Sequence, residues 1–589
     1  MSSATTAIVD SITSIIPKTS GRPKILIPEK VSPDGLALLS PHFDIDQPRG
    51  LSPYDLISQI PSYQALIIRS ETKVTAEVLA AARSLKVVAR AGVGVDNVDV
   101  DAATKLGVIV VNSPSGNIVA AAEHTIALLM AVARNVPGGD RSLRNGDWER
   151  SKLVGTEVGG KTLGIIGLGK VGLKVARMGV GLGMKVIAMD PYASPEIAKS
   201  ANVTLVASLK ELLPVSDFLT IHTPLIASTL DLIGEEQLKT MKKTAKILNV
   251  ARGGVYNEQA LLDALDNETI AGAGLDVFTS EPPKPGSAAE ALCRHPKVVA
   301  TPHLGASTVE AQENVSLDVC AQVLAILQGG LPTSAVNAPL ILPEEYRKLQ
   351  PFVRLVEKMG SLYTQHFVRK GGAVGGKTFS LIYEGELASI SNTRPLFAAL
   401  VKGLTSSISD SGGRDVNIVN ASLIAKSKGI SINETHTRDA EDLVYASLVT
   451  LRTTVNGEEQ VISGYVSGKG IFISRLSRFS TSFVPEGQIL ILHNYDEPGK
   501  IGGVGSVLGR RGVNINFMSV AGLDDGSDNG GNSASVRVRR SDSGVGVDPD
   551  VSKENEALMI LGIQGEVDKS VEDDLRGEKG ILDVSVIKL

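Results

Sequence analysis

Short apolar runs alternate with helical patterns along the first three hundred or so residues of the chain. A run that is apolar throughout is typical of a parallel strand covered on both faces, and a period near 3.6 indicates the helix between two such strands. Near the N-terminus the runs lie at Lys24 to Pro28, Ala65 to Arg69, Val87 to Arg90 and Val108 to Asn112. The pattern predicts a parallel α/β domain of about 100 residues in this region.

The next apolar run leads directly into a glycine-rich turn and a helical pattern, as Gly167-Leu168-Gly169-Lys170-Val171-Gly172. Gly167 allows a sharp turn, Gly169 lets the backbone approach a pyrophosphate, and Gly172 allows close packing of helix on strand. The following run, Lys185 to Met189, ends in Asp190, whose carboxylate would accept a hydrogen bond from a ribose 2′-hydroxyl. The sequence therefore predicts a dinucleotide site, with a glycine-rich turn and an incidental acid as the alternative.

Three chemically active side chains follow later apolar runs. These runs are Phe218 to His222, Lys246 to Val250, Gly272 to Phe278 and Val298 to Thr301. Arg252, Glu281 and His303 come after the last three of them, and open α/β sheets bind ligands at the carboxyl ends of their strands. A guanidinium suits a carboxylate, and an acid beside histidine favours the imidazolium that can give a proton to a carbonyl. Taken singly, they fit equally well as a surface cation, a solvated acid and a packing histidine.

The C-terminal part has a different order of elements. A helix over Glu310 to Gln328 is followed by Gly329-Gly330 and several prolines, which mark a domain boundary. The middle module, with a run at Ala421 to Gly429 and a strand at Gln460 to Val466, indicates little by spacing alone. The last hundred residues predict a βαββαβ order, with strands at 489–493, 514–520, 557–563 and 581–587 and helices at 501–511 and 567–575. Residues 526–555 read as an insertion.

Composition narrows the classes of protein to which the chain can belong. A net charge of −5, with 21% charged residues, gives no field for nucleic acid. Two cysteines make neither a disulfide framework nor a zinc site, so we expect no metal and a reducing, cytoplasmic location. The apolar run at Ile126 stops at Arg134, well short of the roughly 18 residues that span a membrane. Residues 1–21, rich in Ser and Thr, are expected to form a disordered tail.

At this point the chain resembles the D-isomer-specific 2-hydroxyacid dehydrogenases. The motifs that carry the resemblance occur in order and cover Lys24 to Leu331: Gly164 to Gly172, His222-Thr223-Pro224-Leu225, Asn249 to Gly254, Gly274 to Phe278 and Thr301 to Ala306. Within that family, Arg69-Ser70, Ala91 to Val98 and Asn112 to Asn117 look like the phosphoglycerate dehydrogenases. The middle module resembles their allosteric substrate-binding domain, and the terminal module resembles their regulatory ACT domain.

The resemblance implies the roles of individual residues. Arg252, Glu281 and His303 would carry catalysis, Arg69, Ser70, Asn117 and Arg252 would contact substrate, and Asp496 and Asn514 would bind an effector. NAD would be held by Gly167, Gly169, Lys170, Val171, Gly172, Asp190, Thr223, Val250, Ala251, Arg252, Asp276, His303, Leu304, Gly305 and Ala306.

The implied architecture has two Rossmann-like doubly wound domains, an α+β intermediate domain and a ferredoxin-like ACT domain. Their expected bounds are 22–124 with 305–332 for the discontinuous substrate domain, 125–304 for the NAD domain, 340–480 and 488–589. The implied activity is NAD-dependent oxidation of 3-phospho-D-glycerate to 3-phosphohydroxypyruvate at the start of L-serine synthesis. A homodimer or homotetramer and L-serine as effector are expected, and a membrane or nucleic-acid partner is not. The resemblance to ACT domains also implies that the strand from Ile489 lies at the edge of its sheet, where it and the helix after Gly499 would meet a second copy.

Two alternatives stay open at this stage. A glyoxylate or hydroxypyruvate reductase has the same three catalytic residues, but such enzymes normally end near the position of Leu331. A non-enzymatic, NAD-sensing co-repressor can keep the fold and the catalytic residues, but it lacks an ACT module. The C-terminal extension favours the phosphoglycerate dehydrogenase over both.

Overall fold

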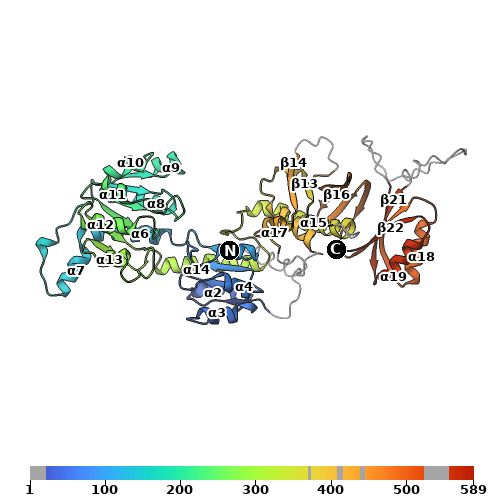
Figure 1. Cartoon of the computed structure of the whole chain (residues 1–589), viewed down its shortest axis with the longest axis horizontal. Coiled ribbons are helices and arrows are strands. Elements are labelled where there is room, and N and C mark those ends of the chain that lie inside the picture. Colours follow the sequence, from blue (N-terminus) through green and yellow to red (C-terminus); the bar gives the residue numbers. More distant parts are fainter. Residues whose placement is uncertain (1–21, 369–372, 407–415, 438–444, 523–555) are drawn as a thin grey trace, which may run out of the picture. The chain divides into compact units, whose positions relative to one another are not determined.

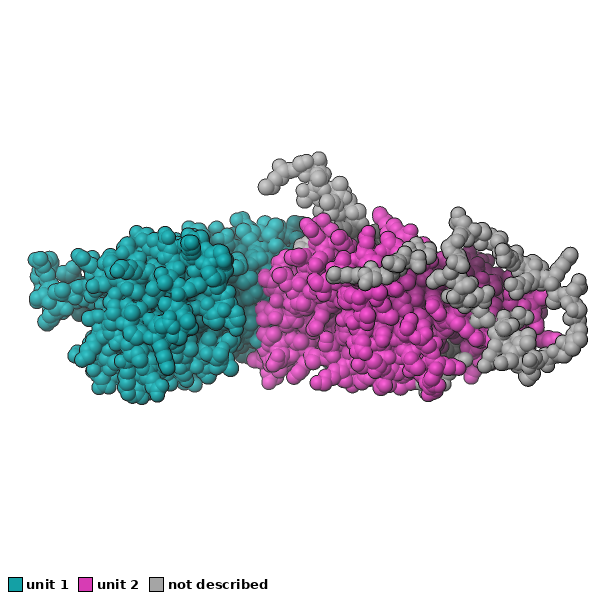
Figure 2. Space-filling model, turned by 90° about the horizontal axis from the view of Figure 1, so that it is seen from above, with its two compact units in different colours: residues 1–74, 82–98, 111–328 teal, residues 75–81, 99–110, 329–589 magenta. Residues whose placement is uncertain are grey.

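The computed structural model describes residues 22–368, 373–406, 416–437, 445–522 and 556–589, and the account below concerns these residues. Contacts divide the chain into two compact units, shown in different colours in Figure 2. Unit 1 comprises residues up to 74, 82–98 and 111–328, and unit 2 comprises 75–81, 99–110 and 329–589. The predicted bounds of four domains stay a prediction. The predicted tail (1–21) and insertion (526–555) lie outside the described residues.

A five-stranded sheet forms the N-terminal layer, in the order β2-β1-β3-β4-β5. Its strands are β1 (Lys24–Leu26), β2 (Asp44–Asp46), β3 (Ala65–Ile68), β4 (Val87–Arg90) and β5 (Ile109–Asn112). The helices that alternate with these strands along the chain are α2 (Pro33–Leu39), α3 (Pro53–Gln59), α4 (Ala76–Ala81) and α5 (Val100–Lys105), and the contacts assign α4 and α5 to unit 2. The late helix α14 (Val309–Leu327) packs against α2 and β4. Sequence analysis missed β2, which is only three residues long.

A seven-stranded parallel sheet follows, in the order β12-β11-β10-β9-β6-β7-β8. Its strands are β6 (Thr162–Ile166), β7 (Lys185–Met189), β8 (Val203–Leu205), β9 (Phe218–Ile221), β10 (Lys246–Asn249), β11 (Gly272–Leu275) and β12 (Val298–Ala300). Its helices are α6 (Ile118–Arg134), α7 (Val136–Arg144), α8 (Lys170–Gly181), α9 (Pro195–Ser200), α10 (Leu209–Leu212), α11 (Glu235–Lys239), α12 (Glu258–Asp266) and α13 (Ala288–Arg294). The strand order reverses between β6 and β9, the switch point at which such sheets bind ligands.

Both faces of this sheet are buried. Leu163, Ile165 and Leu248 point into one hydrophobic cluster, whereas Leu219 and Ile247 point into another. Burial on both faces explains why the strands are apolar throughout, and therefore why the sequence predicted them.

Helix α6 contains the longest apolar run of unit 1. In the part of the chain that the structure describes, no single helix is long and apolar enough to cross a membrane. One bent pair, α6 with α7 at 63°, passes that test together by length and composition only. Helix α6 packs against β10, β11 and β12.

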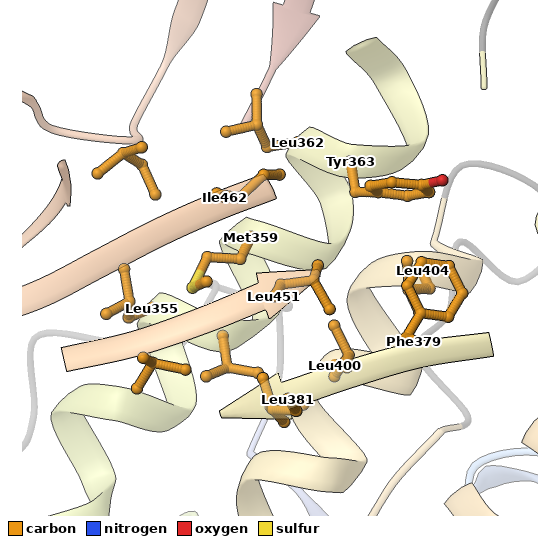
Figure 3. Packing of buried hydrophobic residues seen from close by; sticks show 14 of the residues in the cluster. Leu355, Met359, Leu362, Tyr363, Phe379, Leu381, Leu400, Leu404, Leu451 and Ile462 are labelled. Carbon is orange, nitrogen blue, oxygen red and sulfur yellow. The ribbon is translucent and has the colours of Figure 1, made fainter. Parts of the chain in front are cut away.

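Unit 2 begins with a six-stranded sheet in the order β14-β13-β15-β16-β17-β18. The strands are β13 (Thr378–Gly385), β14 (Ser431–Thr437), β15 (Ser447–Val455), β16 (Glu458–Ser467), β17 (Gly470–Leu476) and β18 (Phe479–Phe483). The helices are α15 (Pro343–Tyr363), α16 (Arg394–Thr405) and α17 (Ala421–Ser427). Figure 3 shows α15 and α16 against the sheet, with Leu355 and Met359 facing Leu451 and Ile462.

The terminal module has the predicted βαββαβ order (Figure 1). Its elements are β19 (Gln488–Tyr495), α18 (Lys500–Arg510), β20 (Asn514–Ala521), β21 (Glu556–Gln564), α19 (Lys569–Gly577) and β22 (Ile581–Lys588). The sheet order is β20-β21-β19-β22. The expectation that the strand from Ile489 lies at the edge is wrong, because β19 pairs with both β21 and β22. The edges are β20 and β22.

Alternate side chains of β19 point to opposite faces and into different cores. Leu490 and Leu492 pack under α18 and α19, while Ile489 and Ile491 join the cluster of the six-stranded sheet. The terminal sheet is therefore covered on both faces within unit 2.

Candidate active site

The glycine-rich turn between β6 and α8 has the backbone that a dinucleotide needs. Gly167 has a φ of 88°, in the left-handed region that favours glycine. A Cβ at Gly172 would clash with the carbonyl oxygen of Gly167, so helix and turn touch there. At Gly169 a Cβ would meet nothing within 4 Å, which leaves the backbone open to a pyrophosphate. The backbone at the three glycines is compatible with the roles predicted for them.

Two side chains that the resemblance assigned to NAD lie around this turn. Asp190 ends β7 and accepts hydrogen bonds from the backbone N–H groups of Leu168 (2.7 Å) and Tyr192 (2.8 Å). It therefore braces the turn, and its remaining lone pairs can still accept from a ribose. The hydroxyl of Thr223 is buried and has no hydrogen-bond partner within the described residues. A bound cofactor would satisfy it, so the residues present fit a dinucleotide.

His303 and Glu281 form a close pair at the ends of β11 and β12. The Nδ1 atom of His303 lies 2.6 Å from Oε2 of Glu281, and both side chains are partly exposed. Burial alone would raise the pKa of Glu281, but hydrogen bonds from His303 and from the Phe278 backbone outweigh it, so this pKa is lowered. The carboxylate therefore stays ionised, fixes the ring and leaves Nε2 for the substrate.

The loop that carries His303 is held by a buried carboxylate. Asp276 accepts from the backbone N–H of Leu304 (2.7 Å) and of Gly305 (2.8 Å). It also receives the hydroxyl of Thr301 at 2.6 Å. These bonds occupy much of its acceptor capacity, so its first role in the structure is to shape the loop from His303 to Gly305.

Arg252 follows β10 in a turn that a buried amide stabilises. Asn249 accepts from the Ala251 N–H (2.9 Å) and donates to the Arg252 carbonyl (2.8 Å). The Arg252 guanidinium lies against Gly94 of the first sheet's loops and 3.4 Å from Asp96. The Arg252 side chain therefore extends from the end of β10 to the loop that follows β4.

Sequence reasoning missed Arg90, the last residue of β4. Its guanidinium lies over Gly92, and its Nε is buried without a hydrogen-bond partner in the described part of the chain. Burial, and next the charge of Arg252, lower its pKa; Asp96 and Glu29 act in the opposite direction without outweighing them, and Arg69 adds to the lowering. Three guanidinium groups thus gather around the site. Nothing in the sequence marked Arg90, because it ends an apolar run like any strand residue.

A cavity of about 590 Å³ adjoins Arg69 and Ser70. Its lining includes two further cations, Lys30 and Arg49, which sequence analysis did not select. Glu29, which also lines it, is buried and accepts from the backbone N–H of Arg69 (2.9 Å) and of Thr72 (3.0 Å). The Glu29 carboxylate therefore stabilises the loop that follows β3. The cationic side chains that line the cavity make it suited to an anion.

The remaining predicted residues lie at the same site or in the terminal module. Lys170 donates to the Ser115 hydroxyl at 2.9 Å, and Asn117 precedes α6 as its N-cap. Val250, Ala251 and Ala306 lie in the loops after β10 and β12, and Val171 lies in the first turn of α8.

The two predicted effector residues belong to strands that are not neighbours. Asp496 follows β19 and is exposed, while Asn514 begins β20 and donates to Asn516 at 3.2 Å. Strand β21 lies between β19 and β20.

Comparison with models of known protein families shows the class of protein. Residues 126–305 match the family model for the D-isomer specific 2-hydroxyacid dehydrogenase, NAD binding domain, so NAD is the cofactor of this domain. Residues 348–473 match the D-3-phosphoglycerate dehydrogenase intervening domain.

Curated relatives then identify the family. The chain is 43% identical to D-3-phosphoglycerate dehydrogenase 2, chloroplastic, of Arabidopsis thaliana, covering 85% of this chain and 81% of the relative. It is 41% identical to the D-3-phosphoglycerate dehydrogenase of Synechocystis sp. (84% and 87%) and 37% identical to that of Methanocaldococcus jannaschii (96% and 100%). The chain belongs to the D-3-phosphoglycerate dehydrogenase family.

Proposed function

We propose that this protein oxidises 3-phospho-D-glycerate to 3-phosphohydroxypyruvate with NAD. The observation that carries the proposal is the gathering of Arg69, Arg90 and Arg252, with Arg252 following β10 and the His303–Glu281 pair following the neighbouring strands β11 and β12 of the same sheet. A cluster of cations that includes the buried Arg90 favours an anionic ligand, and this substrate supplies two anionic groups, a carboxylate and a phosphate. The alternative substrate glyoxylate or hydroxypyruvate carries a single anionic group and leaves the Arg69 side of the site unpaired.

Each catalytic side chain has one task in this mechanism. Arg252 holds the substrate carboxylate through its planar fork and places the C2 hydroxyl before His303. Nε2 of His303 takes the hydroxyl proton, while Glu281 keeps the ring oriented through Nδ1 and stabilises the imidazolium that forms. Bound NAD would supply the acceptor for the hydride that leaves C2. Its pyrophosphate would rest on Gly167 to Lys170 and its ribose on Asp190.

Turnover with two substrates tests the proposal. We expect NAD reduction with 3-phosphoglycerate, measured with a carbonyl reagent that traps the keto product because oxidation of the alcohol is uphill. D-glycerate, which lacks the phosphate, should react far more slowly. Equal kcat/KM for both would favour the reductase alternative, and no turnover at all would favour the co-repressor. His303→Ala should lower kcat by about 10²-fold to 10⁴-fold, the usual contribution of general acid–base catalysis.

We also propose that L-serine, the end product of the pathway that this reaction begins, binds the terminal module as an effector. The start of α18, where Gly499 has a φ of 90°, offers backbone donors for a carboxylate. Nearby, Oδ1 of Asn494 is buried and unpaired among the described residues, and Asp496 is exposed. Because β21 separates Asp496 from Asn514, we assign the two residues to a site shared by adjacent copies of the module.

The effector test uses the full-length chain. Because the terminal sheet shares a core with the rest of unit 2, removing it would expose apolar side chains and confuse the result. Titration of L-serine should inhibit the wild type and the control Asp573→Ala, which changes an exposed helix residue, but not Asn514→Ala. Indifference of the wild type at millimolar serine would contradict the proposal.

A homodimer or homotetramer is the proposed assembly. Helix α7 and the residues after it project from unit 1 in Figures 1 and 2. This segment exposes Leu143 (59%), Trp148 (82%) and Val154 (77%), an apolar surface that a second copy of the chain would cover. Light scattering should give at least a dimer, and Trp148→Ser should weaken it relative to Tyr192→Ser, a change of another exposed ring. Location in the cytoplasm stays a proposal, supported by two free cysteines.

A further inference from the structure

A histidine outside the predicted site touches the support of the catalytic loop. His124 lies on α6, and its Nε2 is 3.2 Å from Oδ1 of Asp276 and 3.0 Å from the hydroxyl of Thr301. Its side chain is 19% exposed, whereas that of Asp276 is 0% exposed. We propose that His124 is a positioning residue for His303, acting through Asp276 and Thr301. The inference rests on the proposed role of His303 as proton carrier.

The backbone of the loop explains why a support is needed. His303 has a φ of 54°, a left-handed conformation that is unfavourable for a residue with a side chain unless its surroundings hold it. The structure holds it through Asp276, whose carbonyl accepts the His303 N–H at 2.9 Å. The carboxylate of the same residue receives the next two N–H groups, of Leu304 and Gly305. The position of one side chain therefore sets the direction of the catalytic imidazole.

The carboxylate of Asp276 must itself be held in one orientation, and His124 helps to hold it. A Cβ at Gly305 would lie 3.2 Å from Oδ2 of Asp276, so loop and carboxylate are in close contact on that side. On the other side, Oδ1 is reached by the Thr301 hydroxyl and by the His124 ring. A hydroxyl turns freely about its bond, whereas an imidazole fixed in a helix presents its N–H in one direction. His124 thus fixes both the carboxylate and the hydroxyl that donates to it.

The electrostatics agree with this arrangement. Burial alone would raise the pKa of Asp276, but hydrogen bonds from His124, then from Thr301 and Leu304, outweigh it, and the pKa is lowered. Without the hydrogen bond from His124, the buried, ionised carboxylate of Asp276 would have an unsatisfied acceptor. It would then shift toward the backbone N–H groups of the loop, which are the nearest donors. Loss of His124 should therefore displace the loop rather than unfold the domain.

Three variants of the full-length protein separate positioning from general damage. His124→Phe keeps the ring and removes the donor, whereas His124→Gln restores an amide donor near the position of Nε2. The control is His295→Phe, because His295 forms a similar pair with Asp266 at 3.3 Å and is not part of the site. We expect His124→Phe to lose roughly 10-fold in kcat, with about 100-fold as the limit for a misplacement of about 1 Å. KM for 3-phosphoglycerate should change little, His124→Gln should recover most of kcat, and the control should match the wild type.

The outcomes decide between the inference and the function on which it rests. A kcat of His124→Phe within about twofold of the wild type overturns the positioning role, as does equal impairment of the Phe and Gln variants. If His124→Phe does not fold, His124→Asn takes its place, since its amide is too short to reach Asp276, and equal kcat of the Asn and Gln variants overturns the role. His303→Ala is measured in parallel. Wild-type kcat in that variant refutes the proposed proton carrier, whereas a loss there without one in His124→Phe refutes only the positioning role.

Discussion

Replacing Arg90 by methionine separates what the site needs for folding from what it needs for binding. The guanidinium is largely buried, its Nε has no partner in the described chain, and burial together with the charge of Arg252 disfavours its ionised form more than Asp96 and Glu29 favour it. Methionine fills a similar volume without a charge. Because a buried charge that its neighbours do not fully compensate destabilises a fold, Arg90→Met should leave Tm unchanged or raise it.

The same change should impair binding of the phosphorylated substrate. A hydrogen bond to a charged group contributes about 1.5–3 kcal/mol, so kcat/KM for 3-phosphoglycerate should fall about 10-fold to 150-fold. We assign Arg90 together with Arg69 to the phosphate and Arg252 to the carboxylate. The small kcat/KM for D-glycerate, which has no phosphate, should therefore change little.

The assay measures NADH formation with both substrates and a trap for the keto product, alongside thermal unfolding. Arg144→Met is the control, because Arg144 is an exposed residue paired with Asp140 on α7. An equal loss with both substrates would refute the assignment of Arg90 to the phosphate. A fall in Tm would refute the view that its charge is a cost to the folded state.

Three further predictions concern the cofactor, the catalytic pair and acid stability. NAD should be strongly preferred over NADP, because the carboxylate of Asp190 repels a 2′-phosphate, and equal kcat/KM for the two would contradict its role. Glu281→Gln should lower kcat and shift the acidic limb of the pH–rate profile, and an unchanged profile would exclude the pairing of Glu281 with His303. Because the pKa of Glu281 is lowered in the folded state, its ionised form stabilises the fold above about pH 4.5, and this stabilisation is lost as the pH falls below that value. Burial lowers the pKa of His222 from 6.5 to about 4, so the unfolded chain binds more protons in this window and stability falls as pH drops from 6.5 to 4. The loss should reach at most about 3 kcal/mol, since the residue as a whole is partly exposed, and His222→Gln should remove this pH dependence in urea titrations.

The strands that the sequence predicted are those that a sheet buries on both faces. Strand β9 is buried at every position, and its apolar run leaves no alternative. Strand β2, by contrast, reads Asp-Ile-Asp and lies at a sheet edge, so no run of apolar residues marks it. Of the six-stranded sheet, the sequence indicated only the run at Gln460 to Val466, which lies in β16, because the strands mix polar and apolar residues and their order follows from pairing rather than from spacing.

The residues of the site also divide into those that local sequence motifs reveal and those that they do not. Gly167, Asp190 and His303 stand in motifs whose spacing is local, so the sequence displays them. Arg90 and Glu29 act because separate strands end at the same place, and a single sequence contains no signal of that convergence. The residues that shape the loops were therefore found only in three dimensions.

The error about β19 has a related cause and a consequence for regulation. A βαββαβ order fixes which elements exist, but strand order depends on which neighbours pair, and here the first strand lies inside the sheet. Its alternate side chains then serve two cores, with Leu490 under the helices and Ile489 in the cluster of the intermediate sheet. Exposing a buried isoleucine or leucine costs about 1.5–3 kcal/mol, and several such residues lie on this face, so the terminal sheet cannot separate from its neighbour without a large loss of stability. An effector bound to this module would therefore contact a sheet whose core continues into the intermediate sheet, so substitutions that test serine binding should leave these shared apolar residues unchanged.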